Sequence, residues 1–113
     1  PDSPTTPAGG SDPATVRIRS IILTTVLKSG LRYGQARVAL ADGADQPVAG
    51  VRVTGYFGGD FDEVLTNHSD SAGWAVLNTL HKTPDPRFRF QVLDVFRDGY
   101  AFDADESPLD AEY

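Results

Sequence analysis

The sequence contains no cysteine and no methionine, and it has a single tryptophan. The absence of cysteine excludes a disulfide framework, a zinc–thiolate site and a thiol nucleophile. No run approaches the roughly 18 consecutive apolar residues of a membrane-spanning helix, so we expect no membrane insertion. Cations are also in deficit, since ten Lys and Arg face sixteen Asp and Glu, for a net charge of −6. Such a surface repels phosphate backbones, so we expect no nucleic-acid partner.

What the sequence does contain is typical of a β-sheet domain. Of its 113 residues, 40% are hydrophobic and 23% are charged, close to the average of folded domains. Aromatic and Val side chains, which suit pleated sheets, supply much of the apolar content. Eleven Gly and eight Pro provide many turn positions. We therefore predict one all-β domain.

Composition divides the chain into three parts. Residues 1–14 are rich in Pro, Gly, Ser and Thr, with almost nothing to bury, which is the composition of a flexible linker. We expect this linker to tether the domain to a neighbour. Because the chain opens with neither a signal peptide nor an initiator Met, we interpret it as a fragment or a processed product. The folded domain is predicted over residues 15–103, and residues 104–113 are predicted to be an acidic tail.

Apolar side chains recur at every second position over most of the chain, which is the period of half-buried strands. No apolar stripe has the period and length of a helix. The clearest strand has an apolar inward row and a polar outward row: Phe88, Phe90 and Val92 against Arg87, Arg89 and Gln91.

Turns rich in Gly, Pro and Asp separate the strands at the spacing of roughly 8–12 residues expected of a sandwich. In the first strand the apolar phase slips at residues 21–23, which predicts a β-bulge or a switch of sheet. The alternation predicts seven strands, over residues 16–26, 31–40, 48–57, 61–66, 74–79, 87–96 and 100–102.

The order of these motifs carries a family resemblance. The relevant stretches are GQARVALADGADQPVAGVRVTGYFGG, TNHSDSAGWAVL and RFRFQVLDVFRDGYAFDAD. They resemble the immunoglobulin-like modules of exported bacterial proteins, which are appended to secreted hydrolases or built into surface proteins. The resemblance covers residues 16–103 and implies an immunoglobulin-like β-sandwich of about seven antiparallel strands in two sheets. It also implies a secreted, cell-surface or periplasmic location and a non-catalytic role as spacer, stabiliser or adhesive surface.

Aromatic residues offer the first candidate binding surface. Tyr56, Phe57 and Phe61 flank the Gly-Gly-Asp stretch at residues 58–60, which interrupts the strand pattern. We expect an exposed aromatic loop tip there, which binds carbohydrate or another surface ligand. Trp74 has two interpretations. It could form a stacking platform for sugars with the tyrosines Tyr33, Tyr56, Tyr100 and Tyr113, or it could pack in the core or at its edge. A single large aromatic at a strand start usually packs across a sandwich, which favours the core.

Carboxylates offer the second candidate site. Asp60, Asp62 and Glu63 lie together in a loop, and clustered carboxylates suit calcium, which takes six to eight oxygen ligands. They are our candidate ligands for a structural calcium ion, the only cofactor that the sequence indicates. The alternative interpretation is a solvated acidic loop that protects a sheet edge. A second acidic cluster, at residues 103–106, has the same two interpretations.

No arrangement of residues predicts an enzyme. His68, Ser69 and Asp70 are sequence neighbours, which is poor geometry for a Ser–His–Asp relay, and no G-x-S-x-G turn is present. His68 and His81 alone do not supply the ligand count of a typical metal site, and we interpret both as solvated. We therefore expect a non-catalytic protein.

Three functions fit these expectations. The leading hypothesis is an accessory or structural module of an exported bacterial protein, which positions or stabilises neighbouring domains or assembles with another protein. The second is a module that binds carbohydrate or another surface ligand. The third is a small subunit that docks on a larger partner through its strand edges.

Overall fold

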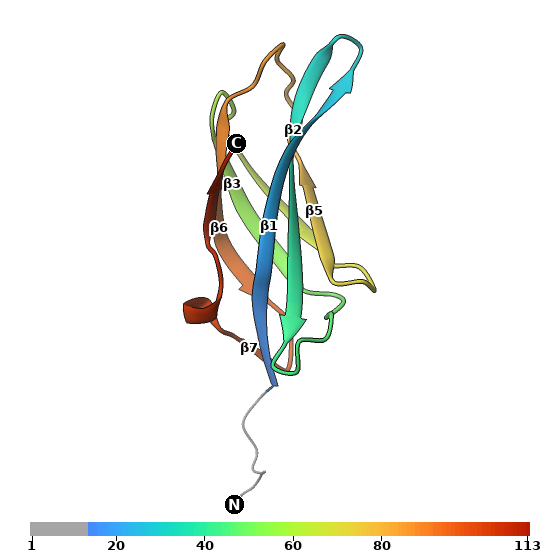
Figure 1. Ribbon diagram of the computed structural model, residues 1–113, viewed down its shortest axis with the longest axis vertical. Coiled ribbons are helices and arrows are strands. Elements are labelled where there is room, and N and C mark those ends of the chain that lie inside the picture. Colours follow the sequence, from blue (N-terminus) through green and yellow to red (C-terminus); the bar gives the residue numbers. More distant parts are fainter. Residues whose placement is uncertain (1–13) are drawn as a thin grey trace, which may run out of the picture.

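The computed structural model describes residues 14–113, which form eight strands and one short 3-10 helix (Figure 1). In chain order these are β1 (Ala14–Lys28), β2 (Leu31–Asp42), β3 (Arg52–Gly59), β4 (Glu63–His68), β5 (Trp74–Asn78), β6 (Phe88–Phe96), β7 (Tyr100–Phe102), η1 (Ala104–Glu106) and β8 (Asp110–Glu112). The linker predicted over residues 1–14 lies outside the described range, apart from Ala14 at the start of β1. Residues 14–113 contain no α-helix, and therefore no helix that could span a membrane.

The strands form two four-stranded sheets. The first sheet has the order β5-β2-β1-β7 and the second has the order β4-β3-β6-β8. Buried side chains from both sheets form one hydrophobic core, which confirms the predicted all-β sandwich. Two details differ from the prediction. Residues 14–113 contain eight strands rather than seven, and β7 runs parallel to β1 whereas the other neighbouring strands are antiparallel.

A long hairpin of β1 and β2 carries the predicted phase slip. The register between the two strands shifts between Ile18 and Ser20, which leaves Arg19 as an extra residue in β1. A bulge of this kind turns the following side chains to the other face. Ile21 therefore packs against the core, as Ile18 does. The β-bulge is confirmed, two residues before the position where the apolar pattern changes.

The core between the sheets is centred on aromatic side chains. The row Phe88, Phe90 and Val92 is buried and the row Arg87, Arg89 and Gln91 is exposed, as predicted. Phe90 packs edge-on against Phe57, with ring centroids 5.0 Å apart at an interplanar angle of 61°. A Cβ atom at Gly55 would overlap the Phe90 ring. Gly55 is thus required for packing rather than for a turn.

The position of Trp74 differs from the favoured prediction. Ala75 and Leu77 are the buried residues of β5, and Trp74 alternates with them on the outer face. The expectation that Trp74 packs in the core is wrong, because the inward position opposite Val38 of β2 belongs to Ala75. Trp74 is partly exposed, and the Arg37 guanidinium lies 4.7 Å from its ring centre.

Residues 104–113, predicted to be an acidic tail, belong to the sandwich. β8 pairs antiparallel with β6. The backbone N–H of Tyr113 then donates to the carbonyl oxygen of Phe88 at 2.9 Å. The Tyr113 ring stacks on the Phe88 ring, with centroids 5.1 Å apart. The Asp-Ala-Glu sequence of β8 has no apolar row that would predict a strand, so only the contact with β6 defines β8.

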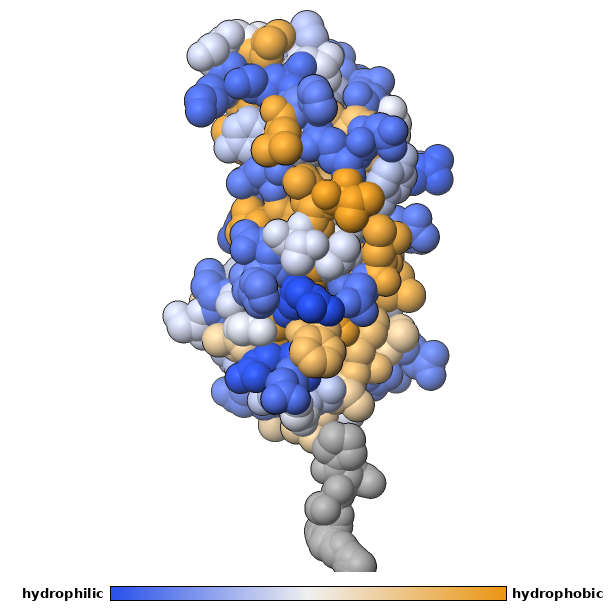
Figure 2. All heavy atoms as spheres, turned by 180° about the vertical axis from the view of Figure 1, so that it is seen from behind, coloured by the Kyte–Doolittle hydropathy of each residue, from blue (hydrophilic) through white to orange (hydrophobic). Residues whose placement is uncertain are grey.

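The outer surface carries apolar side chains among the polar ones. In Figure 2, hydrophobic residues gather around mid-height and along one side of the face shown, and hydrophilic residues cover most of the remainder. Single exposed apolar residues are normal, whereas groups of them mark interaction surfaces. The large exposed hydrophobic side chains are Ile22, Leu27, Leu31, Val64, Leu80, Leu93, Phe96, Leu109 and Tyr113.

Candidate functional site

The aromatic loop tip predicted around residues 58–60 is not exposed. Phe57 lies on the inward face of β3 and is fully buried, and Phe61 turns back into the core. The Phe61 ring packs edge-on against Phe88, with centroids 5.5 Å apart. The prediction that Phe57 and Phe61 form a ligand-binding surface is wrong, because both side chains are packed in the core between the two sheets.

Tyr56 and Trp74 remain accessible, but they lie on different sheets. Tyr56 alternates with buried neighbours on the outer face of the second sheet. Its hydroxyl donates to Asp62 Oδ1 at 2.8 Å, which holds the pKa of Tyr56 above its ordinary value. Trp74 is on the outer face of the first sheet, where Arg37 covers one face of its ring. The two aromatic residues therefore cannot form a single stacking platform.

The three candidate calcium ligands point to three different partners. Asp60 Oδ2 accepts the backbone N–H of Arg87 at 2.8 Å, and Asp62 accepts the Tyr56 hydroxyl. Glu63 is turned inward and buried. Across residues 14–113, no three Asp, Glu or His side chains are grouped so that they could hold a metal ion. The predicted calcium cluster is therefore not assembled in this structure.

Glu63 has a structural role that its sequence context did not indicate. It accepts the backbone N–H of Leu80 at 2.7 Å and that of His81 at 3.2 Å, and it lies 3.0 Å from His81 Nδ1. Burial by itself raises the pKa of this carboxyl, but the hydrogen bonds from Leu80 and His81 outweigh burial and lower the pKa below its ordinary value. The ionised Glu63 thus fixes the segment that follows β5.

The neighbours His68, Ser69 and Asp70 also serve the fold. Ser69 is buried, donates from Oγ to the Val48 carbonyl at 2.6 Å and accepts the Val51 N–H at 2.9 Å. Asp70 accepts two backbone N–H groups of its own turn. His68 is exposed at the end of β4. Ser69 and Asp70 are committed to backbone groups, and neither contacts the His68 ring.

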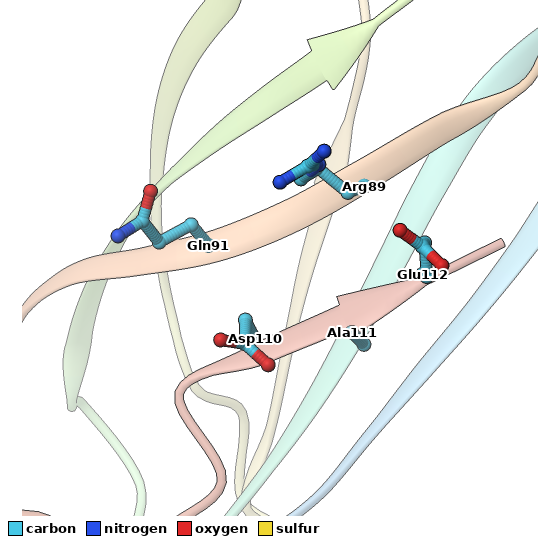
Figure 3. Close-up of a pocket in the computed structure, with 5 residues that line it drawn as sticks. All are labelled: Arg89, Gln91, Asp110, Ala111 and Glu112. Atoms are coloured by element: carbon cyan, nitrogen blue, oxygen red, sulfur yellow. The ribbon is translucent and has the colours of Figure 1, made fainter.

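A shallow hollow between β6 and β8 lies on the outer face of the second sheet. It has a volume of about 370 Å³ and is lined by Arg89, Gln91, Asp110, Ala111 and Glu112. Figure 3 shows Arg89 and Gln91 extending from β6 beside the carboxylates of Asp110 and Glu112 on β8. Arg89 is opposite Glu112 in the strand register, and Gln91 is opposite Asp110.

A second hollow adjoins the first and shares Arg89 and Glu112 with it. Its volume is about 240 Å³, and Tyr113 is one of its lining residues. Tyr113 is 46% exposed although its ring stacks on Phe88. We call the two hollows together the β8 groove, formed by Arg87, Arg89, Gln91, Asp110, Glu112 and Tyr113.

The β8 groove combines uncommitted polar groups with an aromatic ring. Within residues 14–113, no salt bridge engages Arg89, Asp110 or Glu112. Guanidinium, amide and carboxylate groups offer hydrogen-bond donors and acceptors to the hydroxyl groups of a ligand. The exposed ring of Tyr113 offers an apolar face for stacking. This set of groups can bind a hydroxyl-rich ligand.

The sequence indicated only half of this groove. The alternation of β6 predicted that Arg87, Arg89 and Gln91 point outward, and they do. Asp110 and Glu112 were assigned to a tail, because the segment around them is acidic and has no apolar row that would predict a strand. Their place opposite β6 comes from tertiary pairing.

Comparison with known proteins adds no relative, since no family model, curated protein or solved structure matches the chain.

Proposed function

We propose that this chain is a non-catalytic, immunoglobulin-like module of an exported bacterial protein, in which it positions neighbouring domains and contributes to their stability or assembly. The strand pairing supports the immunoglobulin-like assignment, since β2 lies beside β5 in one sheet and β3 beside β6 in the other. In immunoglobulin sandwiches the second strand lies beside the fifth, and the third beside the sixth, in the same way. There are two departures from that order. β4 lies beside β3 rather than beside the fifth strand, and β7 pairs with β1 before the chain returns as β8 beside β6.

The positions of the two ends of the folded part carry the proposed spacer role. Ala14 pairs with Tyr100, and Tyr113 bonds to Phe88. The whole of β6 separates these two contacts, which is roughly 30 Å at the rise of a strand. Figure 1 shows β1 starting at one end of the sandwich and the C-terminus lying toward the other. A rigid domain that the chain enters and leaves at opposite ends holds its neighbours at a fixed separation.

Single-molecule energy transfer tests this role. The chain is inserted between two fluorescent domains and compared with a Gly/Ser linker of matched length. We expect one narrow distance distribution for the chain and a broad one for the linker, which behaves as a random coil. A distribution as broad as that of the linker, or direct contact between the flanking domains, would contradict the spacer role.

The β8 groove favours a second candidate function, the binding of carbohydrate. Arg89, Gln91 and Glu112 present donors and acceptors on a sheet face, and Tyr113, which is 46% exposed, is the aromatic residue in the adjoining lining. Sugars bind through both kinds of contact, because their hydroxyls hydrogen-bond and their C–H faces stack on aromatic rings. The position differs from the one expected from the sequence, where Tyr56, Phe57, Phe61 and Trp74 were the candidates.

Calorimetry with soluble cello-, xylo- and chito-oligosaccharides tests this second function. We expect binding that Gln91→Ala or Tyr113→Ala weakens by roughly tenfold, the equivalent of about 1.4 kcal/mol. Arg52→Ala is the matched control, because Arg52 is exposed on the same sheet and pairs with Asp94 outside the groove. Absence of binding by all three glycan classes, or equal loss in the control, would argue against a glycan site here.

A further inference from the structure

The tip of the β1–β2 hairpin concentrates positive charge. The sequence contains two lysines, Lys28 and Lys82. Both line one hollow of about 220 Å³ beside this tip. The net charge of the chain is −6, so the pairing of its only lysines distinguishes this end from the rest of the surface. The other lining residues are Tyr33, Asn78, Thr79 and Leu80.

Leucine side chains are exposed at the same end. Leu80, which lines the hollow with the two lysines, is 80% exposed, and Leu31 beside the hairpin turn is 37% exposed. In the strand register Leu31 is opposite Lys28, so the two side chains share one face of the hairpin. Exposed apolar groups that cluster next to charge are typical of interaction surfaces. We call this end the docking tip, formed by Lys28, Leu31, Tyr33, Leu80 and Lys82.

Hydrogen bonds fix the docking tip before any partner binds. Arg32 and Thr83 exchange two backbone hydrogen bonds of 2.9 Å, which join the segment after β5 to the hairpin. The buried Glu63 carboxylate accepts the backbone N–H of Leu80. The exposure of Leu80 therefore belongs to an ordered segment. A preordered segment loses little conformational entropy on binding.

The polar groups of the hollow are mainly donors. Each lysine carries an ammonium group, which donates and cannot accept. The side-chain oxygen of Asn78 accepts one hydrogen bond, from Gln35 Nε2 at 3.0 Å, and its amide nitrogen adds two donors. Tyr33 adds a hydroxyl. A ligand that satisfies this hollow must supply acceptors, and carboxylates match both the donors and the charge.

We propose that the docking tip binds an acidic segment of a partner protein, with carboxylates on Lys28 and Lys82 and an apolar side chain against Leu80. Charge complementarity favours such a segment over a flat anionic membrane. The acidic excess elsewhere on the surface repels a membrane, whereas a narrow extended segment meets only the tip. The inference rests on the assembly role proposed above and names the surface that serves it.

An NMR titration of the full chain tests the inference. The probe is a mixture of hexapeptides that each contain three Asp or Glu and one Leu or Phe, and the reference is the same mixture with Lys in place of the acids. We expect the acidic mixture alone to shift the amide signals of residues 27–33 and 78–83. Binding should weaken several-fold between about 0.05 and about 0.3 M salt, because these charges are exposed and screened.

Variants assign the contacts. The double variant Lys28→Glu with Lys82→Glu should bind roughly tenfold more weakly or not at all, and Leu80→Ser should weaken binding to a smaller extent. Arg52→Ala is the matched control, since it removes an exposed cation that pairs with Asp94 away from the docking tip and should leave peptide binding unchanged. Retained binding by the double variant would overturn the assignment.

Three other outcomes would also overturn the inference. These are no localised shifts at millimolar peptide, binding to phosphatidylserine vesicles in place of peptides, and shifts of the same signals when only the protein concentration rises. The last two would assign the tip to a lipid surface or to a second copy of the chain. The spacer measurement does not involve the docking tip, so failure of the spacer role and failure of the docking tip appear in separate experiments.

Discussion

The two parts of the β1–β2 hairpin are stabilised by different interactions. In the part near the sheet centre, Ile18 and Leu40 are almost completely buried against the second sheet. In the part beyond Gly34, Leu27 and Leu31 are exposed. Gly34 lies at the boundary, next to the core side chains of Phe61 and Phe88. One continuous ladder of hydrogen bonds thus runs from a hydrophobic environment into solvent.

Directed polar contacts support the part beyond the core. The backbone hydrogen bonds between Arg32 and Thr83 join the exposed part of the hairpin to the segment after β5. The Glu63 carboxylate holds that segment by accepting two of its backbone N–H groups. The Thr25 hydroxyl lies 3.3 Å from the Tyr113 hydroxyl. Hydrophobic burial depends on side-chain volume, whereas these contacts depend on ionisation and geometry. The two parts should therefore respond to different perturbations.

The largest expected effect comes from truncating the buried part. Leu40→Ala removes a fully buried side chain, which should lower the free energy of unfolding by about 2–5 kcal/mol. Leu27→Ala makes the same change in the exposed part of the hairpin and should alter it by about 0.5 kcal/mol or less. Denaturant titration measures both. Equal losses would show that the core extends over the whole hairpin.

A methyl group at the boundary should have the next largest effect. A Cβ atom at Gly34 would lie 2.9 Å from Phe61 Cε2 and 3.3 Å from Phe88 Cζ. Gly34→Ala should therefore lower the free energy of unfolding by about 1–3 kcal/mol, as overpacking of a core does. Gly43→Ala in an exposed turn is the control, where the added atom meets only the Thr15 hydroxyl. An unchanged stability of Gly34→Ala would place the boundary of the core elsewhere.

The polar support should make stability depend on acid pH. The folded-state pKa of Glu63 is lowered, so its contribution is present above the unfolded-state value of about 4.3 and is lost as the pH falls through the folded-state pKa. Glu63→Gln should lower the free energy of unfolding by about 1–2 kcal/mol at pH 7. Once the pH has fallen below the folded-state pKa, the variant and the parent chain should converge. Parallel stability curves at all pH values would contradict this role.

The smallest expected effect is at the lysines of the docking tip. Both side chains are exposed, so Lys28→Glu with Lys82→Glu should change the free energy of unfolding by about 0.5 kcal/mol or less. Thermal unfolding followed by circular dichroism measures this. A larger loss would mean that the lysines support the hairpin itself, and the loss of peptide binding could then follow from altered structure.

Some errors of the sequence-based prediction have a common cause. Both rows of β5 are apolar enough to be buried, so alternation does not say whether Trp74 or Ala75 faces inward. The register with β2 decides it, because Ala75 is opposite the buried Val38. In the same way, Phe57 and Phe61 flank a turn in the sequence, and only the space between the sheets draws them into the core.

The sequence by itself determined seven of the eight strands of residues 14–113, the bulge in β1 and the inward row of β6, because burial of one sheet face imposes a period of two on neighbouring residues. Tertiary structure alone decided the candidate sites. The β8 groove joins residues 87–91 to residues 110–113, and the docking tip joins the hairpin turn to residues 80–82. Local periodicity holds no information about such pairs, since their proximity depends on which strands meet across the sheets.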